Sequence, residues 1–155
     1  FPKPGQDPYP AAQLREVLMR HPRTTVIWAH VGLGRIVHPV RDQLGIIDRA
    51  ASISGLDHVH FDISWDEVAK YVVASPEAIA ATAELIERHP ERFLFGTDEV
   101  APANQKAYLK VYDMYAPLLA RLKPETRRLL LRGNYERLFD AARTRVRAWE
   151  KEHVK

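Results

Sequence analysis

The sequence contains no cysteine, which excludes disulfide bonds, thiolate-bound zinc and iron–sulfur clusters. Any metal ion must therefore be held by histidine, aspartate or glutamate side chains. No apolar run approaches the roughly 20 residues that a membrane-spanning helix needs. The hydrophobic fraction of 46% and the charged fraction of 28% are ordinary for a globular domain. We expect a cytoplasmic protein with no membrane partner.

The chain has little excess charge of either sign, since its net charge is only +3 over 155 residues. The basic residues nevertheless gather at the end, because residues 121–155 hold eleven Lys or Arg against five Asp or Glu. A basic segment can bind nucleic acid, but it is more often the solvated face of a helix. We expect no nucleic-acid partner and keep nucleic-acid binding through this C-terminal helix as an alternative function.

Three short apolar segments, at residues 24–30, 57–64 and 92–98, alternate with helical patterns. This alternation predicts right-handed βαβ units with a parallel sheet, which is the α/β class. The first segment is apolar on both faces, and such strands do not belong at the edge of a sheet. Three strands alone leave two edges open. The sequence therefore predicts an incomplete sheet, and the proline-rich start suggests that an N-terminal half is absent.

Each predicted strand ends on a polar side chain. His30 ends the first, Asp62 and Ser64 end the second, and Asp98 ends the run Arg92-Phe-Leu-Phe-Gly-Thr-Asp. In parallel α/β architectures ligands and metals bind at the C-terminal ends of strands. The sequence therefore predicts a site at this rim, although Thr-Asp also opens turns and caps helices.

Several helix boundaries carry recognisable signals. Ser64 and Glu67 form a Ser-x-x-Glu capping box, and Ser75 before Pro76 is a second helix start. Asn104 is predicted to cap a later helix. Near the end of the chain, Gly133 is expected to terminate a short helix and Asn134 to cap the last one.

Four motifs occur in order: Val26-Ile-Trp-Ala-His-Val-Gly-Leu-Gly-Arg35, Phe61-Asp-Ile-Ser-Trp-Asp66, Arg92-Phe-Leu-Phe-Gly-Thr-Asp98 and Gly133-Asn-Tyr-Glu-Arg-Leu-Phe139. Together they resemble the C-terminal half of the amidohydrolase superfamily. The branch is similar to the amidohydrolase-2 group, which includes aminocarboxymuconate semialdehyde decarboxylase and resorcylate-type decarboxylases.

The resemblance implies a partial (β/α)8 TIM barrel, in which residues 1–155 supply strands 6 to 8 with their helices. A full barrel needs about 250 residues. The function implied is that of a metal-dependent hydrolase or decarboxylase (carboxy-lyase) acting on a small carboxylated or aromatic substrate. The cofactor would be a divalent metal, zinc before manganese. The family's His-x-His pair on strand one and its histidine on strand five have no counterpart here, so the fragment is expected to be inactive.

The resemblance also assigns roles to individual residues. His30 matches the family histidine that activates water or the substrate, and Asp98 matches the carboxylate that binds the metal and shuttles a proton. Arg35 is a candidate to hold a substrate carboxylate and Trp65 to wall an aromatic substrate. A surface arginine and a core tryptophan are the structural alternatives for these two.

The pair His58-Val-His60 imitates the superfamily's His-x-His motif. The flanking motifs place it on strand seven, with His58 near the N-terminal end of that strand, so we do not expect it to bind metal. A non-enzymatic alternative also remains, because open edges of a parallel sheet invite association. In that case the chain would be a half-barrel that pairs with itself or with a complementary N-terminal half.

Overall fold

The computed structural model describes residues 9–33 and 42–154. Three strands, β1 (Val26–Trp28), β2 (Val59–Asp62) and β3 (Phe93–Leu94), form one parallel sheet in the order β1-β2-β3. The predicted α/β class with a parallel sheet is confirmed, and the small sheet is compatible with part of an α/β barrel. The strands are shorter than predicted, because each leaves the sheet for a turn that carries polar side chains.

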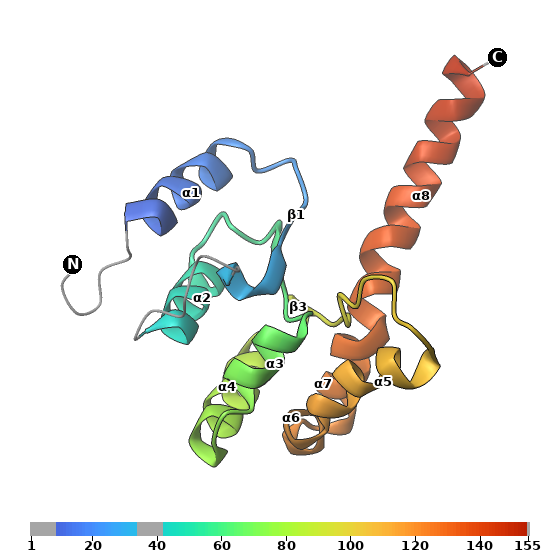
Figure 1. Ribbon diagram of the computed structural model, residues 1–155. Helices are drawn as coiled ribbons and strands as arrows, with labels where there is room; N and C mark the ends of the chain where they lie inside the picture. The colour runs from blue at the N-terminus through green and yellow to red at the C-terminus, as the bar shows by residue number, and fades with distance from the viewer. Residues whose placement is uncertain (1–8, 34–41, 155) are drawn as a thin grey trace.

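The helices follow the alternating order that the sequence indicates, and several of them pack around the sheet (Figure 1). Figure 1 also shows the last helix, α8, projecting away from the rest of the chain towards the C-terminus. The helical elements are α1 (Tyr9–Arg20), the 3-10 turn η1 (Ala29–Gly32), α2 (Gln43–Ser52), α3 (Asp66–Val72), α4 (Pro76–Arg88), α5 (Gln105–Met114), α6 (Ala116–Arg121), α7 (Pro124–Arg128), the π-helical turn η2 (Leu129–Gly133) and α8 (Asn134–His153).

The hydrophobic core is built around the sheet. Val59, Phe61 and Ile63 are at most 1% exposed, and His60 and Ser64 at the alternate positions are 4% and 6% exposed, so the second strand is buried on both faces. The Phe61 ring lies 6.1 Å from the Trp28 ring and 5.5 Å from the Phe93 ring, so aromatic contacts link all three strands. Burial of these large side chains is what holds so small a sheet together.

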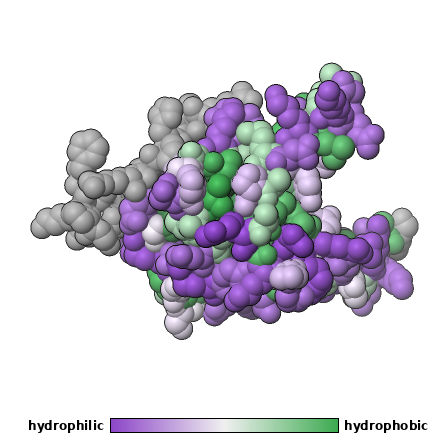
Figure 2. Space-filling model, turned by 90° about the horizontal axis from the view of Figure 1, so that it is seen from below, coloured by the Kyte–Doolittle hydropathy of each residue, from purple (hydrophilic) through white to green (hydrophobic). Residues whose placement is uncertain are grey.

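Hydrophilic side chains cover most of the face shown in Figure 2. No helix within residues 9–33 and 42–154 is long and apolar enough to cross a membrane.

Two of the predicted helix starts are confirmed and a third is wrong. The Ser75 side chain accepts a hydrogen bond from the Ala78 amide, and the Asn104 side chain accepts one from the Ala107 amide. Helix α3, in contrast, has Trp65 at its N-cap, with no side-chain cap. Ser64 does not form the predicted capping box, because its hydroxyl is engaged at the rim of the sheet.

The predicted helix break at Gly133 is also wrong. Gly133 has helical backbone angles (φ −60°, ψ −39°), and the π turn η2 joins α7 to α8 without interruption. Asn134 is fully buried, and its amide nitrogen donates hydrogen bonds to the carbonyls of Pro90 and Phe93, both at 2.8 Å. Asn134 therefore ties α8 to β3 instead of capping a helix.

Candidate active site

Polar side chains from all three strand ends meet at one rim of the sheet. The His30 imidazole follows β1, and its Nε2 lies 3.8 Å from Asp98 Oδ2, beyond β3. Its other nitrogen, Nδ1, lies 3.8 Å from Oδ2 of Asp62 at the end of β2. Parallel strands present their carboxyl ends to the same edge, which is why residues far apart in the sequence converge here. The imidazole thus stands between two carboxylates.

Ser64 connects the central carboxylate to the imidazole. Its hydroxyl donates to Asp62 Oδ2 at 2.6 Å, and its amide donates to Asp62 Oδ1 at 2.8 Å. The same hydroxyl oxygen lies 3.2 Å from His30 Nδ1, and the Ser64 carbonyl lies 3.3 Å from that nitrogen. Both oxygens of Asp62 are therefore occupied by Ser64, which leaves this carboxylate a structural part of the rim.

These contacts determine which nitrogen of His30 carries the proton. The single hydroxyl proton of Ser64 is used on Asp62, so both Ser64 oxygens near His30 act as acceptors. Nδ1 must then donate, and in the neutral ring Nε2 carries the lone pair. That lone pair lies on the side of Asp98. The tautomer, assigned from the hydrogen bonds, makes Nε2 the nitrogen that is able to accept a proton.

The backbone at the rim adopts conformations that side chains with a Cβ rarely take. His30 has φ 56°, Trp65 has φ 93° and Asp98 has φ 51°, so at least one such residue follows each strand. A left-handed conformation at a non-glycine residue costs on the order of 1–3 kcal/mol and is concentrated at functional sites. Three such residues around one imidazole indicate that the geometry of this rim matters more than its stability.

The turn after β1 depends on its glycine. Gly32 has φ 79°, and a Cβ at this position would lie 3.0 Å from the Trp28 ring. Only glycine fits both the left-handed backbone and the close approach to the indole. Gly32 therefore fixes how the chain leaves His30.

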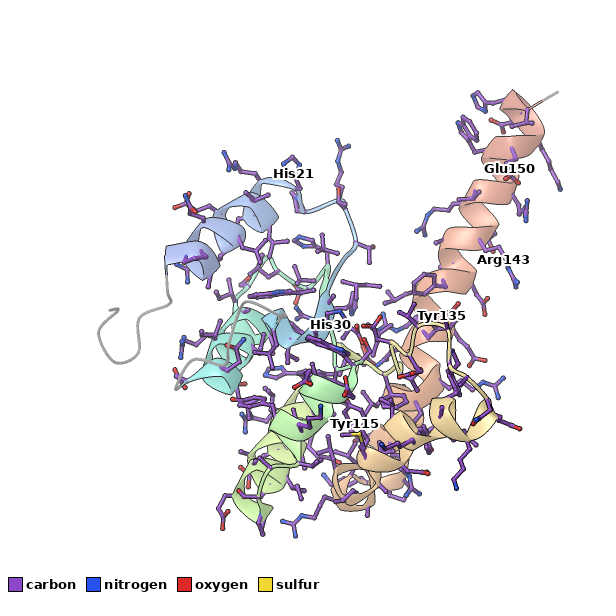
Figure 3. All side chains as sticks on the ribbon, in the orientation of Figure 1. His21, His30, Tyr115, Tyr135, Arg143 and Glu150 are labelled. Carbon is purple, nitrogen blue, oxygen red and sulfur yellow. The ribbon has the colours of Figure 1, made fainter. Side chains whose placement is uncertain are left out.

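Trp65 and Tyr115 shape the remaining side of the rim. The Trp65 ring lies 5.4 Å from the His30 ring with an interplanar angle of 53°. The Tyr115 hydroxyl, wholly buried, donates to the carbonyls of Trp65 and Ile63 and so holds the chain on both sides of Ser64. Burial raises the pKa of Tyr115, so the hydroxyl stays protonated and remains a donor. Figure 3 shows His30 and Tyr115 in the middle of the molecule.

The rim is open enough for a ligand to reach it. The side chain of Asp98 is 43% exposed and that of His30 is 27% exposed, whereas Asp62 is 18% exposed. The two residues predicted to do chemistry are thus the more accessible ones. Arg35, the predicted substrate-carboxylate ligand, lies outside the described residues.

The donor types at the rim suit a divalent metal, since imidazole nitrogen and carboxylate oxygen both bind zinc and manganese. The number of donors does not suffice. Within residues 9–33 and 42–154 no group of three or more histidine or acidic side chains lies close enough together to hold an ion. The carboxylate of Asp98 is therefore of a kind that could bind such an ion, but the described residues do not form a complete metal site.

The His58-Val-His60 pair takes no part in the rim. His58 Nε2 lies 3.2 Å from the Leu18 carbonyl, and His60 is 4% exposed, with no hydrogen-bond partner for Nδ1 among the residues that the structure describes. Burial, followed by the charges of Arg92 and Arg137, lowers the pKa of His60 to about 4. His60 is therefore a neutral core residue at physiological pH.

Sequence reasoning did not identify the parts played by Ser64 and Tyr115. Ser64 reads as a helix cap, and Tyr115 reads as one more apolar position on a helix. A tyrosine on a buried helical face needs a hydrogen-bond partner for its hydroxyl, and this requirement could have pointed to Tyr115 as a residue that binds a distant part of the chain.

Comparison with known families and proteins gives one match. A family model described as "Amidohydrolase" matches residues 10–141, which include His30, Asp62, Ser64, Trp65 and Asp98. No curated protein and no solved structure matches the chain.

Proposed function

Because the chain belongs to the amidohydrolase family, we propose that His30 and Asp98 form part of the active site of a metal-dependent hydrolase or carboxy-lyase. Members of this family generally use divalent metals in hydrolase-type reactions. The finer proposal is that residues 1–155 are the C-terminal part of a (β/α)8 barrel, strands 6 to 8 with their helices. The branch we propose is the one that includes aminocarboxymuconate semialdehyde decarboxylase.

The observation that supports this proposal is the position of the His30 lone pair. Nε2 lies 3.8 Å from Asp98 Oδ2, at the C-terminal ends of parallel strands, on a partly exposed rim. A hydrogen-bonded Nδ1 and a free Nε2 are what a general base requires. The left-handed backbone at both residues supports the same interpretation, since such strain is retained where function needs it.

Each residue has a distinct role in the proposal. A divalent ion, when bound, would lower the pKa of a coordinated water and polarise the substrate. Asp98 would be one ligand of that ion, and zinc is the first choice before manganese. His30 would accept or donate a proton at Nε2. Asp62, held by Ser64, would keep the Nδ1 side of the imidazole in place.

The proposed substrate is small and carries a carboxylate or an aromatic ring. Trp65 supports this choice, because its ring forms the wall next to the His30 imidazole. Arg35 is the proposed partner of a carboxylate by a bidentate contact. The bond cleaved follows from which group the substrate presents to Nε2, so hydrolysis and decarboxylation are both outcomes that the same residues can support.

Metal binding by the chain alone provides the first test. Asp98 is the one metal ligand that this proposal names, so we expect weak binding of Mn2+, seen by NMR as paramagnetic broadening of the amide signals around residues 30, 64–66 and 98. Asp98→Asn should abolish the broadening, whereas Asp113→Asn, at a carboxylate outside the rim, should leave it unchanged. Broadening centred elsewhere, or tight binding of zinc in a calorimetric titration, would contradict the assignment.

Activity requires the missing ligands. We expect no turnover by the chain alone. Co-expression with the N-terminal half of another family member should give a complex that hydrolyses an amide or ester, or releases CO2 from an aromatic acid, in the presence of zinc. His30→Asn and Asp98→Asn should each lower kcat by about 100-fold or more, the contribution expected of a general base or of a metal ligand. A well-folded complex without either activity would refute the proposal.

A further inference from the structure

The outer part of α8, residues 142–153, lies almost wholly beyond the stretch that the family model matches, which ends at residue 141. This part of the helix projects from the body of the chain (Figure 1). Every residue from Arg143 to Trp149 is exposed to solvent. Nothing in the active-site proposal uses this segment, so its surface needs a separate explanation.

An apolar stripe runs along the segment. Ala142, Val146, Trp149 and His153 follow one another at spacings of four, three and four residues, which is the spacing of the inner positions of a coiled coil. Val146 is 52% exposed and Trp149 is 56% exposed. The Trp149 ring stacks on the His153 ring at 4.7 Å with an interplanar angle of 8°. A row of large exposed side chains on a projecting helix is typical of a contact surface.

The charges beside the stripe reverse sign along the helix. The positions flanking it, called e and g in a coiled coil, are Arg143 and Arg145 in the first turn and Glu150 and Glu152 in the last. Arg143 pairs with Asp140 and Glu150 pairs with Arg147 along the same exposed helix surface, whereas Arg145 and Glu152 make no ion pair within the described residues. A basic end and an acidic end on the same edges make the segment complementary to itself when a second copy runs in the opposite direction.

The register of such a pair follows from the stripe. If Val146 packs against Trp149 of a second copy, then Ala142 packs against His153 of that copy, and each small residue meets a ring. The same register places Arg143 beside Glu150 and Arg145 beside Glu152, on both sides of a twofold axis. In a parallel pair, only Arg145 and Glu150 would be matched across the interface. Each Trp149 ring would then face the Trp149 ring of the other copy.

We propose that residues 142–153 of α8 form an antiparallel contact with the same segment of a second copy, making a twofold-symmetric dimer. The interface is isologous, because every contact occurs twice. It is short compared with the interfaces of stable dimers, so the dimer should be weak and its population should rise with concentration. Added salt should weaken it, because all four flanking pairs are solvent-exposed.

Charge reversal provides the test, by sedimentation velocity of the complete 155-residue chain over a range of concentrations. The wild type should show a reversible monomer–dimer equilibrium. Arg143→Glu with Arg145→Glu makes all flanking positions acidic, and Glu150→Arg with Glu152→Arg makes them all basic, so each variant alone should be monomeric. A mixture of the two should recover the dimer as a heterodimer.

The matched control is Lys106→Glu with Lys110→Glu, which changes the net charge by the same amount at two exposed positions of α5, outside the proposed contact. It should dimerise like the wild type. Because the chain has no cysteine, orientation can be tested by disulfide formation: Val146→Cys should cross-link with Trp149→Cys in a mixture, but not with itself. A monomeric wild type, loss of the dimer in the control, or self-cross-linking of Val146→Cys would each overturn the proposal.

Discussion

Replacing Tyr115 by phenylalanine removes one hydroxyl and leaves the ring in place. That hydroxyl donates to the carbonyls of Ile63 and Trp65 and is wholly buried. The Trp65 carbonyl keeps its bond from the Ala69 amide, whereas Tyr115 is the donor that the Ile63 carbonyl loses without replacement. Leaving one buried carbonyl unpaired costs about 1–3 kcal/mol, and we expect the free energy of unfolding to fall by about 2 kcal/mol.

Urea denaturation followed by circular dichroism measures this change. With a dependence on urea of about 2 kcal/mol per molar, the midpoint should fall by about 1 M. Tyr112→Phe is the matched control, because Tyr112 lies in α5, which ends just before Tyr115, and has 38% of its surface exposed; its midpoint should not change. A Tyr115→Phe midpoint equal to that of the wild type would show that the hydroxyl does not hold the chain around Ser64.

Two further changes test the interior. The pKa of His60 is lowered to about 4 from an ordinary value of 6.5, so the unfolded chain binds more protons than the folded chain between pH 4 and pH 6.5. The contribution of His60 to the free energy of unfolding should therefore be constant above pH 6.5. Below pH 6.5 it should fall by about 1.4 kcal/mol per pH unit, down to pH 4. His60→Gln should remove most of this slope in urea titrations at several pH values; an unchanged slope would contradict the burial of a neutral imidazole. Asn134→Asp replaces two donated hydrogen bonds by a carboxylate facing the Pro90 and Phe93 carbonyls and should cost about 3 kcal/mol or more of unfolding free energy. Asn104→Asp, at an exposed cap where aspartate serves equally well, should be neutral in the same measurement.

The sequence was sufficient to predict the class of fold and the meeting of the strand ends. The alternation of apolar segments with helical patterns identified the strands, and parallel topology then implied that His30 and Asp98 approach each other, as they do at 3.8 Å. Their roles in catalysis, and that of Trp65, remain predictions. The fold class and the meeting of the strand ends both follow from short-range sequence periodicity combined with the rule that sites lie at the C-terminal ends of parallel strands.

The residues that were misread are those whose partners are distant in the sequence. Ser-x-x-Glu is a local capping pattern, but the Ser64 hydroxyl donates to Asp62, two residues before it, and lies 3.2 Å from Nδ1 of His30, 34 residues away. Asn134 follows a glycine, which locally predicts a new helix, yet its amide nitrogen donates to the carbonyls of Phe93 and Pro90, 41 and 44 residues away. Local patterns give candidate partners for a polar side chain, and tertiary packing decides among them.

Because α7 continues into α8 without a break, α8 moves as one rigid rod that pivots at Asn134, where its first turn is fixed to the body of the chain. With 20 residues at 1.5 Å each, α8 is about 30 Å long, so a tilt of about 5° at this pivot moves the tip by about 2.6 Å. A flexible hinge at Gly133 would have absorbed such a tilt. Because the helix continues through that residue, small rearrangements beside β3 are transmitted, enlarged, to the far end of the chain.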